Sequence, residues 1–305
     1  MIKPNALKFG DNIGIVAPAG PLVKDIFFSG VDQLKSLGFK TKFNKDIFAK
    51  KGYLAGHDQR RAEELNKMFL DPEIKAIICA RGGYGSARLI PLIDKAGIKK
   101  NPKIFMGFSD ITSLHLSINK ECSLVTFQGP MVASDQLINL KELTRHSLLD
   151  TLTKPLPPPE LYISRDTIVR EGYGQGALVG GCLSILIHSL GTSYEVDTDN
   201  KILFLEDWRE APYSIDRMLT HLKLANKFDK VKGVLFGDMS FYPRRKDNKK
   251  YLKGLIEDIF KGYKFPICID LPFGHGSENV VLPLGVKVTL DTSKGIMTFN
   301  EPAVI

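Results

Sequence analysis

The chain has 305 residues, 43% of them hydrophobic and 25% charged, an ordinary globular composition that is long enough for two modest domains. Its first apolar run is cut by Pro18 and Gly20, and no stretch reaches the roughly 20 uninterrupted apolar residues of a membrane span. We therefore expect a cytoplasmic protein with no secretory signal and no membrane partner.

The net charge of +8 comes from lysines and arginines spread along the whole chain. The one dense basic patch, at 244–250, lacks the interleaved aromatic residues of a base-stacking surface, so we interpret it as a solvated loop and expect no nucleic-acid partner. The cysteines are scattered among apolar neighbours and form no CxxC pair, which predicts buried free thiols rather than disulfides or a zinc site. They are Cys79, Cys122, Cys182 and Cys268.

Strand-like and helix-like segments alternate through the first half of the chain. The apolar runs at 12–18, 74–80 and 103–109 are continuous, which is typical of parallel strands covered on both faces. Helices are predicted at 24–37 and 58–69, the second with its charged residues on a polar face. These charged residues are Asp58, Arg60, Arg61, Glu63 and Glu64. The alternation predicts a doubly wound, flavodoxin-like or Rossmann-like α/β domain over residues 1–150.

A proline-rich stretch separates this domain from the remainder. Residues 153–162 contain four prolines, so we predict a linker at 151–168. Beyond it, the strand-like run at 201–207, a helix that begins near Ser214 and further strand-like runs predict a smaller mixed α/β domain over 169–305.

The segment Gly107-Phe108-Ser109 ends a buried strand and passes straight into an amphipathic helix. This resembles a nucleophile elbow, the sharp turn that presents a serine hydroxyl at the edge of a sheet. The full G-x-S-x-G pattern would need glycine at position 111, where this chain has Ile111. Taken alone, Ser109 is therefore interpreted equally well as the N-cap of the helix.

The loop at 80–85 holds three glycines in four positions and follows a neighbouring strand. Glycine lets backbone N–H groups approach a substrate closely, and ligands of doubly wound sheets bind beyond the carboxyl ends of the strands. The loop lacks the spacing and the Lys-Ser/Thr end of a P-loop. We therefore expect it to donate one N–H group to an oxyanion, together with the N–H group of Asp110.

A serine nucleophile needs a base, and His275 is the strongest candidate because it lies in a turn between Gly274 and Gly276. The alternative is a turn residue without a special role. The other five histidines have no adjacent chemistry that we can name: His57, His115, His146, His188 and His221. A carboxylate should hold the imidazole, and both Glu206 and Asp207 end the strand at 201–207, so spacing does not choose between them.

Seven segments in order resemble one known family nearly from end to end. They are GIVAPAGP, ARGGYGSARLI, GFSD, TFQGPM, GALVGGCLSIL, ILFLEDWREAPYSIDRML and LPFGHGSENVVLPLG. The sequence resembles the LD-carboxypeptidases, a group of serine peptidases that also includes the microcin C immunity peptidases. The resemblance implies an N-terminal α/β domain joined to a smaller mixed domain, usually in a homodimer, and no metal or organic cofactor.

The resemblance also implies a catalytic triad of Ser109, Glu206 and His275, which selects Glu206 over Asp207. Its oxyanion donors fall on the backbone N–H groups of Gly83 and Asp110. The family's activity is release of the terminal D-alanine from muropeptide tetrapeptides during peptidoglycan recycling, with this small peptide as substrate. As substrate contacts we expect Gly82, Tyr84 and Trp208.

Two other functions stay open. Microcin immunity members cleave a peptidyl or aminoacyl nucleotide amide with the same triad motifs, and Trp208 would then be a candidate for stacking the nucleobase. We favour the cell-wall substrate because the chain is compact and has no obvious inserted loop. A two-domain binding protein without catalysis is the second alternative, and the absent export signal counts against it.

Overall fold

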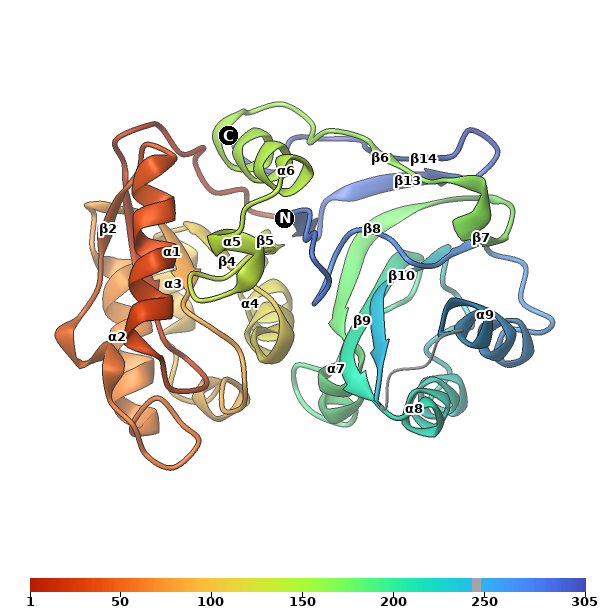
Figure 1. Cartoon of the computed structure of the whole chain (residues 1–305), viewed down its shortest axis with the longest axis horizontal. Helices are drawn as coiled ribbons and strands as arrows, with labels where there is room; N and C mark the ends of the chain where they lie inside the picture. The colour runs from red at the N-terminus through yellow and green to blue at the C-terminus, as the bar shows by residue number, and fades with distance from the viewer. Residues whose placement is uncertain (243–247) are drawn as a thin grey trace.

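The computed structural model describes residues 1–242 and 248–305. Two parts lie side by side in Figure 1, one mainly from red to yellow-green and the other mainly from green to blue. Each is built around its own sheet. The predicted solvated loop at 244–250 lies largely outside the described residues, and only its last three residues, 248–250, are described, at the start of a helix.

The first sheet has the order β12-β5-β4-β3-β1-β2, and its five consecutive strands run parallel in the order of a flavodoxin-like fold. They are β1 (Asn12–Val16), β2 (Lys40–Lys42), β3 (Ile74–Cys79), β4 (Ile104–Gly107) and β5 (Thr126–Gln128). The edge strand β12 (Leu282–Leu284) arrives from the far end of the sequence and pairs antiparallel with β5.

Helices cover both faces of this sheet, because its strands carry apolar side chains on both sides. On one face pack α1 (Lys24–Ser36), α5 (Asp135–Ile138) and α6 (Glu142–Thr153). On the other pack α2 (Asp58–Leu70), α3 (Lys95–Lys100) and α4 (Thr112–Cys122). Short 3-10 turns lie at Lys45–Phe48 and Ala87–Leu89. The doubly wound architecture predicted from the sequence is confirmed.

The second sheet is mixed, with the order β6-β14-β13-β8-β9-β10-β11-β7. Its central strands run parallel: β8 (Tyr173–Cys182), β9 (Lys201–Glu210), β10 (Gly233–Phe241) and β11 (Ile267–Cys268). Antiparallel strands flank them: β6 (Leu161–Tyr162), β7 (Ile168–Arg170), β13 (Lys287–Asp291) and β14 (Ile296–Phe299). A 3-10 turn at Arg165–Thr167 precedes β7.

One face of the second sheet is covered by α7 (Leu183–Ser189), α8 (Pro212–Leu224) and α9 (Asn248–Ile259). Its other face joins the apolar cluster that contains Phe27 and Ile15 of the first part, so a single core runs through both parts. The predicted domain limits stay a prediction: β6 lies inside the proline-rich segment, and β12 returns to the first sheet.

Two charged side chains of α2 lie where the sequence analysis did not expect them. Arg61 and Glu64 were predicted on a polar face, but they are only 1% and 5% exposed, because loops from neighbouring strands cover that part of the helix. Burial raises the pKa of the Glu64 carboxyl to about 7, against the opposing charge of Arg60.

The four cysteines are buried free thiols, as predicted. Within the described ranges, no helix has the length and apolar content needed to cross a membrane.

Candidate active site

Ser109 lies in a strained turn at the carboxyl end of β4. Its φ of +63° is in the left-handed region, which costs a residue with a side chain free energy and is uncommon outside turns and strained sites. The residue opens a 3-10 turn, Ser109–Ile111, that leads into α4. The N-cap of that turn is Phe108, and no side-chain cap is formed. Ser109 is therefore not the helix cap that the alternative interpretation required, and the geometry is that of an elbow.

The glycine loop after β3 packs directly against this elbow. A Cβ built on Gly82 would lie 3.0 Å from both Cβ and Oγ of Ser109, so only glycine lets the loop come so close. Gly83 has a φ of +114°, which also favours glycine. The N–H group of Asp110 lies in the first turn of a helix, where backbone donors have no partner within the helix. Gly83 and Asp110 thus lie on the two segments that border the serine.

Glu206 and His275 form a hydrogen-bonded pair in the second part. Glu206 is fully buried on β9, and His275 lies in the loop between β11 and β12. Nδ1 of His275 is 2.6 Å from Oε2 of Glu206. Gly274 makes this approach possible, because it has a φ of +101° and a Cβ there would lie 2.8 Å from Cβ of Glu206. With Nδ1 engaged, Nε2 is the nitrogen left to exchange a proton.

The charges around His275 favour its protonated form. Burial lowers the pKa of the imidazole, but the charge of Glu206 and its hydrogen bond raise it, and Asp207 and Asp238 add smaller contributions of the same sign. The net result is a pKa above the ordinary value for histidine. A base of this kind accepts a proton more readily than an isolated imidazole does.

Contacts between the two parts bring the imidazole to the elbow. The ring of Phe108, next to Ser109, meets the ring of His275 edge to face at 4.8 Å between centroids. Gln136 donates a hydrogen bond of 2.7 Å to the carbonyl of Gly276, which ties the histidine loop to α5. Among the hydrogen bonds of the described residues, none joins Ser109 to His275. The carboxylate and the imidazole are therefore already paired, and the imidazole contacts the ring of the residue before the serine.

The structure separates the roles of Glu206 and Asp207. The carboxylate of Asp207 accepts hydrogen bonds of 2.8 Å from the backbone N–H groups of Ser184 and Trp208, so it holds the start of α7. Burial raises the pKa of Asp207, with a further contribution from Glu206. Only Glu206 meets the imidazole, because successive residues of a strand point to opposite faces.

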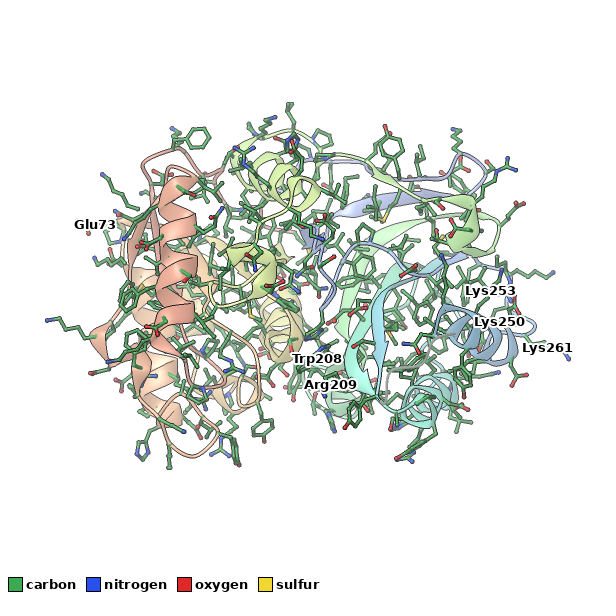
Figure 2. All side chains as sticks on the ribbon, viewed as in Figure 1. Glu73, Trp208, Arg209, Lys250, Lys253 and Lys261 are labelled. Atoms are coloured by element: carbon green, nitrogen blue, oxygen red, sulfur yellow. The ribbon has the colours of Figure 1, made fainter. Side chains whose placement is uncertain are left out.

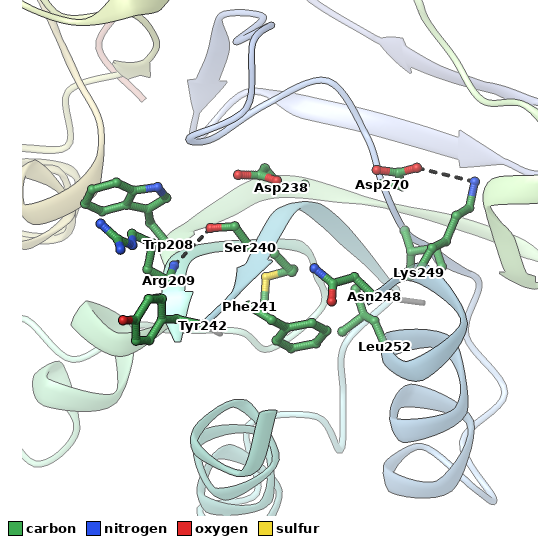
Figure 3. A pocket seen from close by; sticks show the side chains of 13 residues that line it. Trp208, Arg209, Asp238, Ser240, Phe241, Tyr242, Asn248, Lys249, Leu252 and Asp270 are labelled. Atoms are coloured by element: carbon green, nitrogen blue, oxygen red, sulfur yellow. Dashed lines mark hydrogen bonds and ion pairs between the residues drawn. The ribbon is translucent and has the colours of Figure 1, made fainter. Parts of the chain in front are cut away.

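Trp208 and Arg209 border a cavity of about 540 Å³ that extends from the histidine side of the site along β10 to α9 (Figure 3). Trp208 stacks on His275 with 5.6 Å between ring centroids and an angle of 9°. The guanidinium of Arg209 lies 5.3 Å from the Trp208 ring and 4.9 Å from that of Tyr242. Figure 2 shows Trp208 and Arg209 at the edge of the second part that faces the first, far from the lysines of α9 and the turn after it.

The remaining predicted contact, Tyr84, is 52% exposed and packs edge to face against Tyr53, with 5.7 Å between ring centroids. The sequence analysis missed Phe108 and Asp238 as neighbours of His275, since no pattern links these positions along the chain. In the ranges that the structure describes, no group of three or more His, Cys, Asp and Glu side chains is arranged to hold a metal ion.

The comparisons with known proteins agree with this architecture. Residues 13–129 match the family model of the LD-carboxypeptidase N-terminal domain, and residues 175–290 match that of the C-terminal domain. A Bacillus subtilis protein described as a probable murein peptide carboxypeptidase is 38% identical, over 96% of this chain and 92% of its own length. The microcin C7 self-immunity protein MccF of Escherichia coli is 30% identical, over 97% of this chain and 94% of its own length.

Solved structures show the same fold. The muramoyltetrapeptide carboxypeptidase from Oxalobacter formigenes is 29% identical and superposes with a TM-score of 0.85, over 95% of this chain and 99% of its own. MccF in complex with glutamyl sulfamoyl guanosine is 25% identical and gives a TM-score of 0.90 over the whole of both chains. Since two family models cover most of its length in the right order, this chain belongs to the LD-carboxypeptidase family.

Proposed function

We propose that the protein is a serine LD-carboxypeptidase that releases the terminal D-alanine of muropeptide tetrapeptides, with Ser109, Glu206 and His275 as its triad. The observation that carries the proposal is the buried Glu206–His275 pair, 2.6 Å between Oε2 and Nδ1, whose imidazole contacts Phe108 in the strained elbow of Ser109. This arrangement has the parts that acyl transfer needs: a nucleophile, a base and a group that orients the base.

The reaction proceeds in two steps. Nε2 of His275 takes the proton of Ser109 as its Oγ attacks the carbonyl of the penultimate residue, and the N–H groups of Gly83 and Asp110 stabilise the oxyanion. The peptide bond breaks, D-alanine leaves with the proton from His275, and the tripeptide stays as an ester on Ser109. Water, deprotonated by His275, then cleaves the ester and restores the serine. Substrate binding closes the serine–imidazole hydrogen bond, as catalytic hydrogen bonds often tighten only in the complex.

The preference for a cell-wall peptide is supported by two observations. Relatives described as murein peptide and muramoyltetrapeptide carboxypeptidases match nearly the whole chain. In addition, the ring of Trp208 already contacts the imidazole of His275 and the guanidinium of Arg209, so a nucleobase would have to compete with these neighbours for it.

The test is release of D-alanine from muramoyl tetrapeptide by the pure protein. We expect wild type to release it and Ser109→Ala to lose nearly all of the activity. Ser117→Ala is the matched control, because Ser117 is a buried serine of α4 whose hydroxyl donates to Glu121 at 3.1 Å and has no place in the site. Absence of D-alanine from the wild-type reaction, or equal release by Ser109→Ala, would refute the proposal.

A microcin-immunity activity is the second candidate. It is favoured by the relative MccF, whose structures hold glutamyl sulfamoyl guanosine and aspartyl sulfamoyl adenosine. The discriminating measurement compares kcat/KM for muramoyl tetrapeptide with that for an aminoacyl sulfamoyl nucleoside. A higher value for the nucleoside conjugate would favour the second activity, whereas binding of the peptide without turnover of either compound would support a binding protein.

We also propose a cytoplasmic location and a homodimer, in which each chain carries a complete site. Fractionation of the source cells tests the location. Sedimentation of the pure protein tests the dimer, and a single species with the mass of one chain would contradict it.

A further inference from the structure

Arg61 is a fully buried arginine that the reaction scheme above does not use. It lies on α2 and is 1% exposed. A charge taken out of water is costly unless hydrogen bonds replace its hydration. Its guanidinium donates to the carbonyls of Pro18 and Gly85, the latter at 3.0 Å, and to the carboxylate of Asp58 at 2.6 Å. Two of its three partners are thus backbone carbonyls of the loops that follow β1 and β3.

The contact with Gly85 reaches the elbow through a single peptide group. The C=O of Gly85 and the N–H of Ser86 belong to the same peptide, and the N–H of Ser86 donates to Oδ2 of Asp110 at 2.8 Å. Ser86 also donates its hydroxyl to the carbonyl of Asp110. One peptide plane is therefore held between a buried guanidinium and a buried carboxylate, and the carboxylate belongs to the residue after the nucleophile.

The contact with Pro18 holds the second loop. Gly20 of that loop donates its N–H to the carbonyl of Gly82 at 3.1 Å, and a Cβ on Gly83 would lie 3.3 Å from Cα of Gly20. Arg61 therefore fixes the glycine loop from both ends, directly at Gly85 and through the Pro18 segment at Gly82. The loop lies close to the serine, because a Cβ on Gly82 would be only 3.0 Å from Cβ and Oγ of Ser109.

We propose that Arg61 is a positioning residue for the oxyanion donors: its guanidinium holds the glycine loop and, through the Gly85–Ser86 peptide, the elbow in the spacing that acyl transfer requires. This inference rests on the proposed function. Displacements of about 1 Å in such a site can cost on the order of 100-fold in rate, so an anchor outside the site affects kcat more than substrate binding. Arg61 touches no reacting atom in this scheme.

The test is Arg61→Lys, which keeps the charge but not the planar fork that reaches three acceptors. The matched control is Arg60→Lys on the same helix, because Arg60 donates to Glu64 and to the carbonyl of Ala55 instead of the glycine loop. For Arg61→Lys we expect kcat for D-alanine release to fall by about 10-fold to 100-fold with KM nearly unchanged. Affinity for a peptide boronate that mimics the tetrahedral intermediate should fall in parallel. Arg60→Lys should keep wild-type values.

Asp58→Asn is the second variant, for the case that Arg61→Lys does not fold. It keeps the shape of the carboxylate that orients Arg61, and its control is Arg88→Gln, which removes the other partner of Asp58. We expect Asp58→Asn to lower kcat several-fold and Arg88→Gln to leave it unchanged. The inference is overturned if a folded Arg61→Lys, or Asp58→Asn in its place, keeps the wild-type kcat and boronate affinity.

Labelling of Ser109 by a fluorophosphonate separates this inference from the proposed function, because the label forms through a similar anionic transition state. If wild type is labelled but releases no D-alanine, the proposed substrate is wrong, and the labelling rates still decide the role of Arg61. A slower rate in Arg61→Lys than in Arg60→Lys supports positioning. Equal rates refute it. A wild type that is not labelled at Ser109 refutes both proposals.

Discussion

We expect the buried side chain of His115 to make the stability of the protein sensitive to acid. The ring is 1% exposed on α4, and its Nε2 lies 2.9 Å from the carbonyl of Gly107, the last residue of the strand before the elbow. Nε2 must therefore carry a hydrogen, and the buried Nδ1 has no hydrogen-bond partner in the described structure. Protonation would place a charge on Nδ1 without compensation. Burial accordingly lowers the pKa of His115 to about 4, against the opposing effect of the bond to Gly107.

The sign and size of the effect follow from this pKa. An unfolded histidine titrates near pH 6.5, so between about pH 6.5 and pH 4 the unfolded chain binds a proton that the folded protein excludes. The contribution of His115 to stability is therefore fully present above about pH 6.5 and is lost as the pH falls toward 4. At pH 4.5 this one residue should lower the free energy of unfolding by about 2 to 3 kcal/mol relative to pH 7.5.

The assay is urea unfolding followed by circular dichroism at several pH values, for wild type and His115→Gln. Glutamine can still donate to Gly107 but does not titrate, so the difference between the two proteins isolates His115 from every other group. His146→Gln is the control, because the side chain of His146 is 57% exposed. If the wild-type and His115→Gln curves stay within about 0.5 kcal/mol of a constant separation over this pH range, the reasoning is wrong.

Three further predictions concern the site and its surroundings. Glu206→Gln should lower kcat by on the order of 10⁴-fold. It should also move the acidic limb of the kcat/KM pH profile to lower pH, because the carboxylate that raises the pKa of His275 is gone. An unmoved limb would contradict the role of Glu206 as the partner of the base. Gly82→Ala should lower kcat by about 100-fold without a matching rise in KM, since the added Cβ would lie 3.0 Å from Oγ of Ser109. Steady-state kinetics test this prediction, and a wild-type kcat in the variant would contradict it. The pKa of Glu64 is raised to about 7, so ionisation of this buried carboxyl should lower the free energy of unfolding as the pH rises from 4.5 through 7. Urea titrations of Glu64→Gln should show this decrease reduced by about 3 kcal/mol. An unchanged decrease in the variant would contradict the prediction.

Much of the fold could be predicted because continuous apolar runs identify buried parallel strands. The runs at 12–18 and 74–80 became β1 and β3, and the helix predicted at 58–69 is α2, Asp58–Leu70. The elbow could be predicted as well, because its strand, turn and helix are adjacent in sequence.

Other features depend on contacts between distant segments. The choice between Glu206 and Asp207 is set by which face of β9 meets the histidine loop, and that loop is some 70 residues further along the chain. The burial of Arg61 is set by carbonyls of two loops that no local pattern connects to α2. Spacing therefore left the carboxylate open and placed the arginine wrongly, whereas the family resemblance selected the carboxylate.

The segment that carries His275 begins after β11 in the second sheet and ends at β12 in the first. Its two ends are thus attached to different halves of the molecule, and any sliding of one half against the other must displace the imidazole. A chimera built from the N-terminal half of one relative and the C-terminal half of another would have to take β12 from the same relative as the N-terminal half, in order to keep the base in place. In such chimeras, the ionisation of this one imidazole would report how accurately the halves have been rejoined.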